Sequence, residues 1–476
     1  MKMEKKRPDG VKSLIRSLEG AIEIFILTAI YYIVWRVGYG DSNFPQYLGV
    51  GKYVLVGIYA LLTSVLFLNY DGFKFGYLKV TDSIVSQWIA LFIVNFITYW
   101  QLCLVSNVLI DPVPMLILMA VGMVVALVCC FAYGRVYHQL YIPRNMVMVF
   151  GREDAITLKF KMDARRDKYQ ITKLLPVECG LDRICKELVN YDAVIINDVP
   201  AEIRNDILKF CYENKIRAYV TPKISDIIIR GAGEITLFDT PLLLVKGVGL
   251  TVPQRIIKRA MDIVLCLAAM IVAAPIMLAT AIAIKLDDGG PVFFIQKRAS
   301  LDGKEFNILK FRSMIVDAEK EGKSIPATDR DPRITRVGHF IRATRIDELP
   351  QILNILKGDM SIVGPRPERL EHIEEYSRDI PEFGYRLKVK GGLTGYAQIF
   401  GKYNTTPYDK LRLDLMYIEN YSLMLDIRLI LMTIRIMLNK ESTEGFDKIE
   451  ELERLKKEAL EQMQEENQEF SSTAGK

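Results

Sequence analysis

Long uncharged apolar runs dominate the first third of the chain. Four of them are close to bilayer length, at about residues 18–35, 53–70, 85–110 and 114–133. An α-helix rises ~1.5 Å per residue, so roughly 20 apolar residues cross a hydrocarbon core of ~30 Å. The pattern therefore predicts a transmembrane bundle of four helices over residues 1–140.

Basic residues are unevenly distributed among the polar segments between these runs. The N-terminal arm, the second loop and the segment after the fourth run carry Lys2, Lys5, Lys6, Arg7, Lys12, Arg16, Lys74, Lys79, Arg135 and Arg144, whereas the first and third loops carry only Arg36 and Lys52. Because positively charged loops stay in the cytoplasm, the N-terminus and everything after Arg135 are expected there. The basic arm leads into the first run without an evident cleavage site, which indicates an anchor.

A fifth apolar run, residues 263–284, has 22 residues without a formal charge and Pro275 near its middle. Proline removes a backbone donor and kinks or breaks a helix. We therefore expect a re-entrant membrane helix over residues 260–286 that bends at Ala274-Pro275 and returns on the same side. The alternative is a fifth spanning helix, because membrane helices do tolerate proline.

Short β-rich runs alternate with amphipathic stretches after the fourth run. Strands are predicted at 145–150, 193–196 and 218–220, with helices at 181–189 and 201–213, which is typical of a Rossmann-like α/β module over residues 141–250. The first strand ends at Gly151 but lacks the three glycines of a dinucleotide site, so we expect a degenerate module. The segment Gly231-Ala232-Gly233 is predicted to be a loop towards the next domain.

Composition fits an α/β membrane protein with large soluble parts. Hydrophobic residues are 50% and charged residues 25% of the 476 positions, and the net charge is +5. Seven cysteines without a Cys-x-x-Cys pair predict reduced thiols. Only three histidines argue against a histidine triad or a multi-histidine metal site. No nucleic acid partner is expected.

A predicted β-hairpin begins the chemically informative part of the chain. Residues 291–298 and 305–312 flank the turn signal Asp302-Gly303, in a loop that can exceed two residues. Lys310 and Arg312 are two apart and so are expected on one face, where two cations suit a phosphate. A solvated basic strand edge is the alternative.

Four further strings follow in one order: Phe311 to Met314 (Phe-Arg-Ser-Met), Asp347 to Gln351 (Asp-Glu-Leu-Pro-Gln), Gly364 to Pro367 (Gly-Pro-Arg-Pro) and Leu393 to Gly395 (Leu-Thr-Gly). With these motifs the chain resembles the bacterial sugar transferase family, the monotopic polyprenyl-phosphate phosphoglycosyl transferases. It is similar to the long members, which carry four helices and a Rossmann-like module in front. The match covers about residues 258–439. It departs at Ala299-Ser300, where a glycine is usual, and at Gly391, where a proline commonly precedes Gly392.

The resemblance implies a reaction and a location. A UDP-sugar would give its sugar 1-phosphate to undecaprenyl phosphate and release UMP, as the first membrane step of exopolysaccharide, capsule or O-antigen assembly. Residues 251–446 would form the α-rich catalytic domain at the cytoplasmic face of the bacterial inner membrane, with the lipid bilayer as a partner. Asp347 would be the nucleophile that carries a covalent phosphosugar.

The positions of Asp347 and Glu348 in the sequence indicate separate roles for the two carboxylates. Side chains at adjacent helical positions point about 100° apart, so Asp347 and Glu348 should do different jobs. Glu348 is the better candidate for Mg²⁺, the expected cofactor, which prefers one or two carboxylates plus substrate phosphates. Pro350 places a helix start close by, so Asp347 could instead be an N-cap. A helix N-terminus would favour its ionised form and lower its pKa.

Other candidate binding residues flank this pair. Arg366 lies between Pro365 and Pro367, which stiffen the turn and suit an anion clamp, with a solvated arginine as the alternative. Arg342 and Arg345 could steady the acid pair or contact a diphosphate. Asp414 could help place nucleotide or metal, or form an interhelix salt bridge.

The last segments point to the membrane surface and to self-association. Arg428 and Arg435 are seven apart in the apolar run 423–438, as in an interfacial helix, with core packing as the alternative. The charged tail, 447–476, predicts a solvated helix that could support a homo-oligomer. Two other functions stay open from sequence: a UDP-releasing membrane glycosyltransferase and a non-catalytic membrane-anchored regulatory scaffold.

Overall fold

The computed structural model describes residues 9–39, 51–74, 80–140, 143–151, 155–163, 165, 167–316, 318, 331–401 and 405–438. The predicted tail helix lies outside these residues. The chain folds into two compact units, one within residues up to Thr221 and one over Pro222–Gly445.

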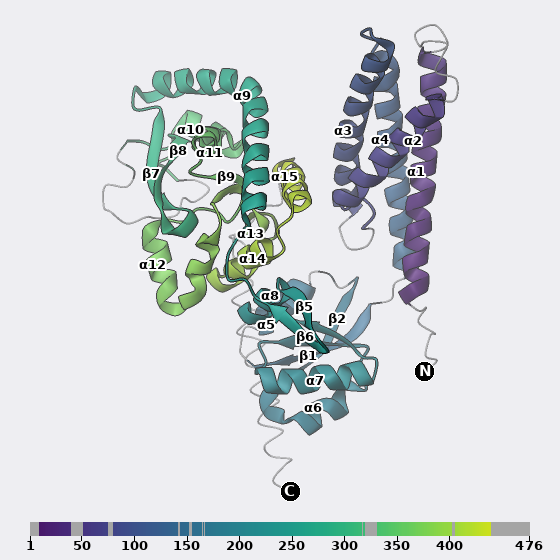
Figure 1. Cartoon of the computed structure of the whole chain (residues 1–476), viewed down its shortest axis with the longest axis vertical. Coiled ribbons are helices and arrows are strands. Elements are labelled where there is room, and N and C mark those ends of the chain that lie inside the picture. Colours follow the sequence, from purple (N-terminus) through teal and green to yellow (C-terminus); the bar gives the residue numbers. More distant parts are fainter. Residues whose placement is uncertain are drawn as a thin grey trace. The chain divides into compact units, whose positions relative to one another are not determined.

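Four long helices begin the first unit: α1 (Asp9–Tyr39), α2 (Gly51–Asn69), α3 (Val80–Ser106) and α4 (Val113–Leu140) (Figure 1). They share one core, in which Tyr31 of α1 stacks on Tyr59 of α2 with ring centroids 4.2 Å apart. Their outward residues are apolar and exposed, as Phe25 shows at 74%. With α9, the described residues contain five helices long and apolar enough to cross a membrane, so the chain is a membrane protein.

The first unit also holds a parallel sheet in the order β2-β1-β3-β4. Its strands and helices are β1 (Arg144–Phe150), α5 (Ala155–Asp163), β2 (Tyr169–Pro176), α6 (Leu181–Leu188), β3 (Ala193–Asn197), α7 (Ala201–Glu213) and β4 (Arg217–Val220). The predicted strands β1, β3 and β4 and helices α6 and α7 are confirmed. Edge strand β2 was missed because its mixed polar residues are only partly buried.

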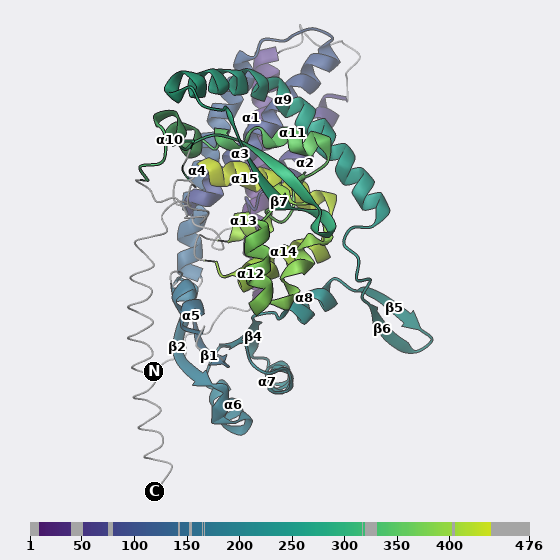
Figure 2. The same ribbon diagram turned by 90° about the vertical axis from the view of Figure 1, so that its left-hand side faces the viewer.

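The second unit opens with α8 (Ile224–Arg230) and a hairpin of β5 (Gly233–Leu237) and β6 (Thr240–Leu244). The predicted loop at Gly231-Ala232 is confirmed as the link between α8 and β5, but Gly233 already begins a strand, and the hairpin itself was not predicted. Both strands are exposed along their whole length, and Figure 2 shows them standing apart from the rest of this unit.

Helix α9 (Val252–Asp288) has 37 residues and holds Pro275 in its interior. Thr251 and Gln254 form a capping box at its start, and Gly289 ends it with a φ of +71°. Figure 1 shows two limbs that meet at a sharp bend. An interior proline is the usual cause of such a kink. The predicted break is thus a bend within one continuous helix, and the helix is longer than the predicted 260–286.

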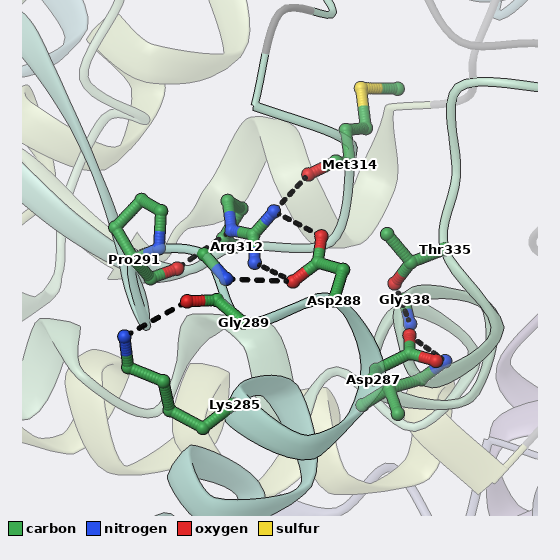
Figure 3. Close-up of polar contacts among 11 residues, drawn as sticks. Lys285, Asp287, Asp288, Gly289, Pro291, Arg312, Met314, Thr335 and Gly338 are labelled. Carbon is green, nitrogen blue, oxygen red and sulfur yellow. Dashed lines mark hydrogen bonds and ion pairs between the residues drawn. The ribbon is translucent and has the colours of Figure 1, made fainter.

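Both limbs of α9 are fastened to the same unit. In the first limb, Lys258 pairs with Asp426 at 2.6 Å, and the carboxylate of Asp262 accepts from the Ile362 amide at 3.1 Å. At the far end, Asp288 pairs with Arg312 (Figure 3). A helix that ran straight would carry these ends about 55 Å apart, at ~1.5 Å per residue.

The remaining elements complete the second unit. They are β7 (Phe293–Ala299), β8 (Glu305–Phe311), α10 (Arg336–Ala343), a 3₁₀ helix (Ile346–Glu348), α11 (Gln351–Lys357), β9 (Ser361–Val363), α12 (Leu370–Asp379), a 3₁₀ helix (Pro381–Lys388), β10 (Gly392–Thr394), α13 (Tyr396–Phe400), α14 (Pro407–Glu419) and α15 (Leu423–Leu438). Among them, α10, α11, α15 and β9 contact α9. The predicted hairpin is confirmed as antiparallel β7 and β8, with Leu301–Gly303 in its turn.

Helix α15 belongs to the core of this unit. Leu429 and Met432 are 0% and 2% exposed, and Arg435 is buried as well. The core-packing alternative therefore describes Arg435 better than an interfacial position. Asp426 of the same helix is fully buried against Lys258 and accepts a hydrogen bond from Tyr417 at 2.8 Å.

The Lys258–Asp426 pair gives a testable stability effect. Lys258→Met leaves the buried Asp426 carboxylate without its cation, so it should lower the free energy of unfolding by about 3–5 kcal/mol. The double variant Lys258→Met/Asp426→Leu removes both charges and should recover most of the loss. Denaturant unfolding in detergent measures both. A double variant less stable than Lys258→Met would contradict the assignment.

Candidate functional site

Three segments of the second unit bring the predicted acid pair together with cations. Strand β8 carries Lys310, the 3₁₀ helix Ile346–Glu348 carries Asp347 and Glu348, and the turn after β9 carries Arg366. The Oε1 atom of Glu348 accepts from Lys310 Nζ at 3.0 Å and from Arg366 Nη2 at 2.7 Å. Glu348 is therefore the centre of a three-residue charge cluster.

A residue that sequence reasoning missed sets the position of Lys310. Asn354 of α11 is 3% exposed, and its side-chain oxygen accepts from the Leu309 amide at 2.9 Å. Its Nδ2 donates to the Asn307 carbonyl at 2.8 Å. These bonds tie the edge of β8 to α11. The signal in the sequence was a polar residue inside the apolar run Ile352 to Leu356.

The charge cluster strongly favours an ionised Glu348. Burial by itself would raise the pKa of Glu348, but Arg366 and Lys310 outweigh it and hold that pKa well below the ordinary value. Burial lowers the pKa of Lys310, and Glu348 opposes that shift. The pair is ionic because each charge has its counterion at hydrogen-bond distance.

Asp347 lies in a different environment from its neighbour. Among the described residues no donor reaches its buried Oδ1 atom. Burial raises the pKa of Asp347, and the charge of Glu348 raises it further. The expected low pKa was wrong, because Asp347 does not cap α11: Pro350 holds the cap position without a side-chain hydrogen bond.

Arg342 and Arg345 flank the acid pair as predicted. Arg342 lies in the last turn of α10, and Arg345 precedes the 3₁₀ helix with a φ of +59°. Both charges lower the pKa of Asp347, without cancelling the effect of burial. A left-handed conformation costs a non-glycine residue energy, so the turn that presents Asp347 is held in place by its surroundings.

Arg312 does not share a partner with Lys310. Its Nη1 donates to Asp288 at 2.6 Å and its Nε to the Pro291 carbonyl at 2.6 Å (Figure 3). Nη1 also reaches the Met314 carbonyl at 3.3 Å. The expected pair of cations on one phosphate is therefore not observed. Instead, Arg312 fastens the C-terminal end of α9.

Asp414 forms a salt bridge, which was the alternative to a role in placing nucleotide or metal. It is 1% exposed on α14 and lies 2.7 Å from Arg386. Glu368 joins them, at 3.3 Å from Arg386 and in contact with Lys410. Burial opposes ionisation, but Lys410 and Arg386 lower the pKa of Glu368 to about 2. The sequence analysis named neither Glu368 nor Arg386, because no motif spacing marks them.

The two departures from the family pattern contact each other. The hydroxyl of buried Ser300 accepts from the Gly391 amide at 3.1 Å and donates to the Asp359 carbonyl at 2.9 Å. Proline has no amide hydrogen to donate. Glycine at 391 therefore lets this serine complete its hydrogen bonds, and one departure compensates for the other.

The carboxylates fit a divalent cation only as part of a larger ligand set. Within the described residues, no group of three or more histidine, cysteine or acidic side chains could hold a metal. Mg²⁺ is commonly held by one or two carboxylates together with substrate phosphates and water. The unpartnered Oδ1 of Asp347, next to Glu348, is compatible with that arrangement.

Fold and site together define a membrane protein with a partly buried carboxylate pair set among lysine and arginine, the charges suited to phosphate groups. The family model described as "Bacterial sugar transferase" matches residues 253–440, which contain every candidate site residue named above. The chain belongs to the bacterial sugar transferase family.

Relatives in this family carry different sugar names. A UDP-N-acetylgalactosamine-undecaprenyl-phosphate N-acetylgalactosaminephosphotransferase of Aeromonas hydrophila is 35% identical over 66% of this chain and 72% of its own length. A UDP-glucose:undecaprenyl-phosphate glucose-1-phosphate transferase of Escherichia coli is 42% identical over 43% of this chain and 44% of its length. A galactosyl transferase of Streptococcus agalactiae is 44% identical over 32% and 35%.

The opposite pKa shifts of the acid pair predict opposite stability effects. The pKa of Asp347 is raised on folding, so its ionised form destabilises the fold above that pKa. Asp347→Asn should therefore raise the thermal midpoint at pH 7, and the gain should shrink towards pH 4.

Glu348→Gln is the matched control. The pKa of Glu348 is lowered, so its charge stabilises the fold at neutral pH. Its removal should cost about 3–5 kcal/mol at neutral pH, a loss that stays nearly constant down to the ordinary pKa of a glutamate and fades only below it. Scanning calorimetry between pH 4 and pH 8 would test both, and shifts of the same sign at pH 7 would refute this assignment.

Proposed function

We propose that this chain transfers a sugar 1-phosphate from a UDP-sugar to undecaprenyl phosphate and releases UMP. The observation that carries the proposal is the unpartnered carboxylate oxygen of Asp347 beside the Lys310–Glu348–Arg366 cluster. A nucleophile needs a free lone pair, and the adjacent cations would attract and orient a diphosphate. The names of the relatives support the same substrates.

The chemistry runs in two displacements at one phosphorus. A carboxylate oxygen of Asp347 attacks the β-phosphorus of the UDP-sugar, and the bond from that phosphorus to the bridging oxygen breaks, so UMP leaves. The phosphosugar is then held on Asp347 as an acyl phosphate, a mixed anhydride. A phosphate oxygen of the polyprenyl phosphate attacks the same phosphorus, the bond from that phosphorus to the Asp347 oxygen breaks, and Asp347 is restored as a carboxylate.

The cations have separate tasks in this scheme. Arg366 keeps 40% of its side-chain surface exposed, so it can contact phosphate while it holds Glu348. Lys310, Arg342 and Arg345 offset negative charge around Asp347. Mg²⁺, which Glu348 would hold together with the diphosphate, would supply further charge neutralisation.

We further propose that α9 enters the membrane and returns on the same side. Its exposed apolar residues include Ile271 at 79% and Val272 at 67%, while both of its ends bond to one compact unit. A spanning helix would hold those ends on opposite faces of the bilayer. Re-entry keeps the site at the cytoplasmic face of the inner membrane, where the nucleotide sugar is made and the lipid phosphate is reached from the surface.

Nucleotide release tests the reaction directly. Purified chain in nanodiscs, with Mg²⁺, undecaprenyl phosphate and UDP-glucose, UDP-galactose, UDP-N-acetylglucosamine or UDP-N-acetylgalactosamine, should release UMP with at least one donor. Chelation of Mg²⁺ should abolish release. Asp347→Asn should reduce it at least about 1,000-fold, and Arg366→Ala about 100-fold or more, as for loss of a nucleophile and of an oxyanion donor.

Intact mass spectrometry without the lipid acceptor tests the intermediate. The native chain should gain the mass of one sugar phosphate, and Asp347→Asn should not. Release of UDP in place of UMP would show a glycosyltransferase instead. No release of either nucleotide by a well-folded preparation would favour a scaffold.

Accessibility labelling tests the re-entrant geometry. In a chain whose native cysteines are replaced, Lys304→Cys in the turn after β7 should react with an impermeant maleimide only in permeabilised cells. Leu109→Cys, 78% exposed between α3 and α4, should react in intact cells as the matched control. Labelling of Lys304→Cys from outside intact cells would show that α9 spans the membrane.

A further inference from the structure

Two arginines, the buried Arg386 and the partly buried Arg298, hold the backbone of the turn at residues 364–367. Arg386 donates from Nη2 to the carbonyl oxygen of Arg366 at 3.0 Å. Arg298 donates from Nη1 to the carbonyl oxygen of the next residue, Pro367, at 3.1 Å. The Arg366 side chain is left to extend to Glu348.

Arg386 is itself fixed on several sides. Its side chain is 2% exposed and lies 2.7 Å from Asp414 and 3.3 Å from Glu368. Its guanidinium carbon is 5.0 Å from the centre of the Phe383 ring. These partners come from α14, from the residue that follows the turn and from the 3₁₀ helix Pro381–Lys388. Arg386 therefore joins three segments at the base of the turn.

The rest of the turn is equally restrained. The Gly364 amide donates to the Thr394 carbonyl at 2.8 Å, and the Gly392 amide donates to the Pro365 carbonyl at 2.8 Å. A Cβ at position 364 would lie 2.4 Å from the Lys390 carbonyl oxygen. The backbone has almost no room to shift while these contacts hold.

We propose that Arg386 is a positioning residue for the transfer reaction: through the Arg366 carbonyl it sets where the Arg366 guanidinium meets Glu348 and the phosphate. This inference rests on the function proposed above. It gives Asp414 a role too, since that carboxylate holds the same Nη2 atom of Arg386 that donates to the turn, and it need not touch nucleotide or metal. A displacement of about 1 Å in a catalytic group can cost 100-fold in rate, so such a support is consequential.

A double-mutant cycle in activity tests the coupling. Arg386→Lys keeps the charge but loses the planar fork that serves several acceptors. In the otherwise native chain it should lower kcat/KM for UMP release about 10- to 100-fold. In an Arg366→Ala background no guanidinium remains to be positioned. There Arg386→Lys should lower kcat/KM less than about threefold. Equal losses in both backgrounds would overturn the proposal.

Asp414→Asn tests the same path through the salt bridge that holds Arg386. It should lower kcat/KM in the otherwise native chain and lose most of that effect in the Arg366→Ala background. A general loss of structure would lower kcat/KM equally in both backgrounds, which would contradict the positioning role.

A cycle in thermal stability needs no turnover. Arg386→Lys and Glu348→Gln both remove the contribution of the Arg366–Glu348 contact, so the double variant should fall short of the summed midpoint loss by about 2–4 °C. Strict additivity would show that Arg386 does not act on this contact. If the native chain released no nucleotide, the proposed function would fail, while this cycle would still decide the placement.

Arg412→Lys is the matched control for every readout. Arg412 also pairs with a carboxylate and donates to a backbone carbonyl, that of Pro222 at 3.1 Å, but it does not contact the turn. Arg412→Lys should change kcat/KM by the same factor in the native and Arg366→Ala backgrounds, and its stability effect should be additive with that of Glu348→Gln. If Arg412→Lys were coupled to Arg366 or Glu348 as strongly as Arg386→Lys, the proposed positioning of Arg366 by Arg386 would be overturned.

Discussion

One carboxylate oxygen, Glu348 Oε1, joins a strand, a 3₁₀ helix and a glycine-proline turn by accepting from both Lys310 and Arg366. Burying a carboxylate in an apolar interior is costly unless cations are close, and here two of them satisfy that need. Both cations must therefore be held close to Glu348, and other residues fix the segments that carry them. Asn354 fixes the strand that carries Lys310, and Arg386 fixes the turn that carries Arg366.

The bend in α9 lets both of its limbs bond to the unit that holds this cluster. Because the first limb is held by Lys258 and the far end by Arg312, the apolar bend can project from the unit without carrying its ends apart. Arg312 thus has an architectural task that its place in the Phe-Arg-Ser-Met string did not reveal. Motif membership marked it as important, but only the tertiary contact with Asp288 shows for what.

Local pattern sufficed for much of the fold. Apolar runs predicted the five long helices, short β-rich runs predicted β1, β3 and β4, and the Asp302-Gly303 turn signal predicted the β7–β8 hairpin, because each signal lies within a short window of the chain. Edge strand β2 and the exposed hairpin β5–β6 lacked that signal. The site was harder, because motifs identify residue types that occur together, whereas the partner of each depends on contacts distant in sequence. The Arg386–Asp414 pair and the Ser300–Gly391 bond could not be predicted from spacing.

Asp347 and Glu348 show how two adjacent acids acquire opposite properties. Both are largely buried, so desolvation raises the pKa of each. The difference lies in the counterions. Glu348 accepts hydrogen bonds from Lys310 and Arg366. Asp347 interacts with the surrounding cations only through longer-range electrostatics, and the charge of Glu348 raises its pKa further. Environments that push neighbouring pKa values apart are the usual way a protein assigns separate roles to like groups. The acid with satisfied hydrogen bonds is suited to hold the site together, and the one with an unpartnered oxygen is suited to react.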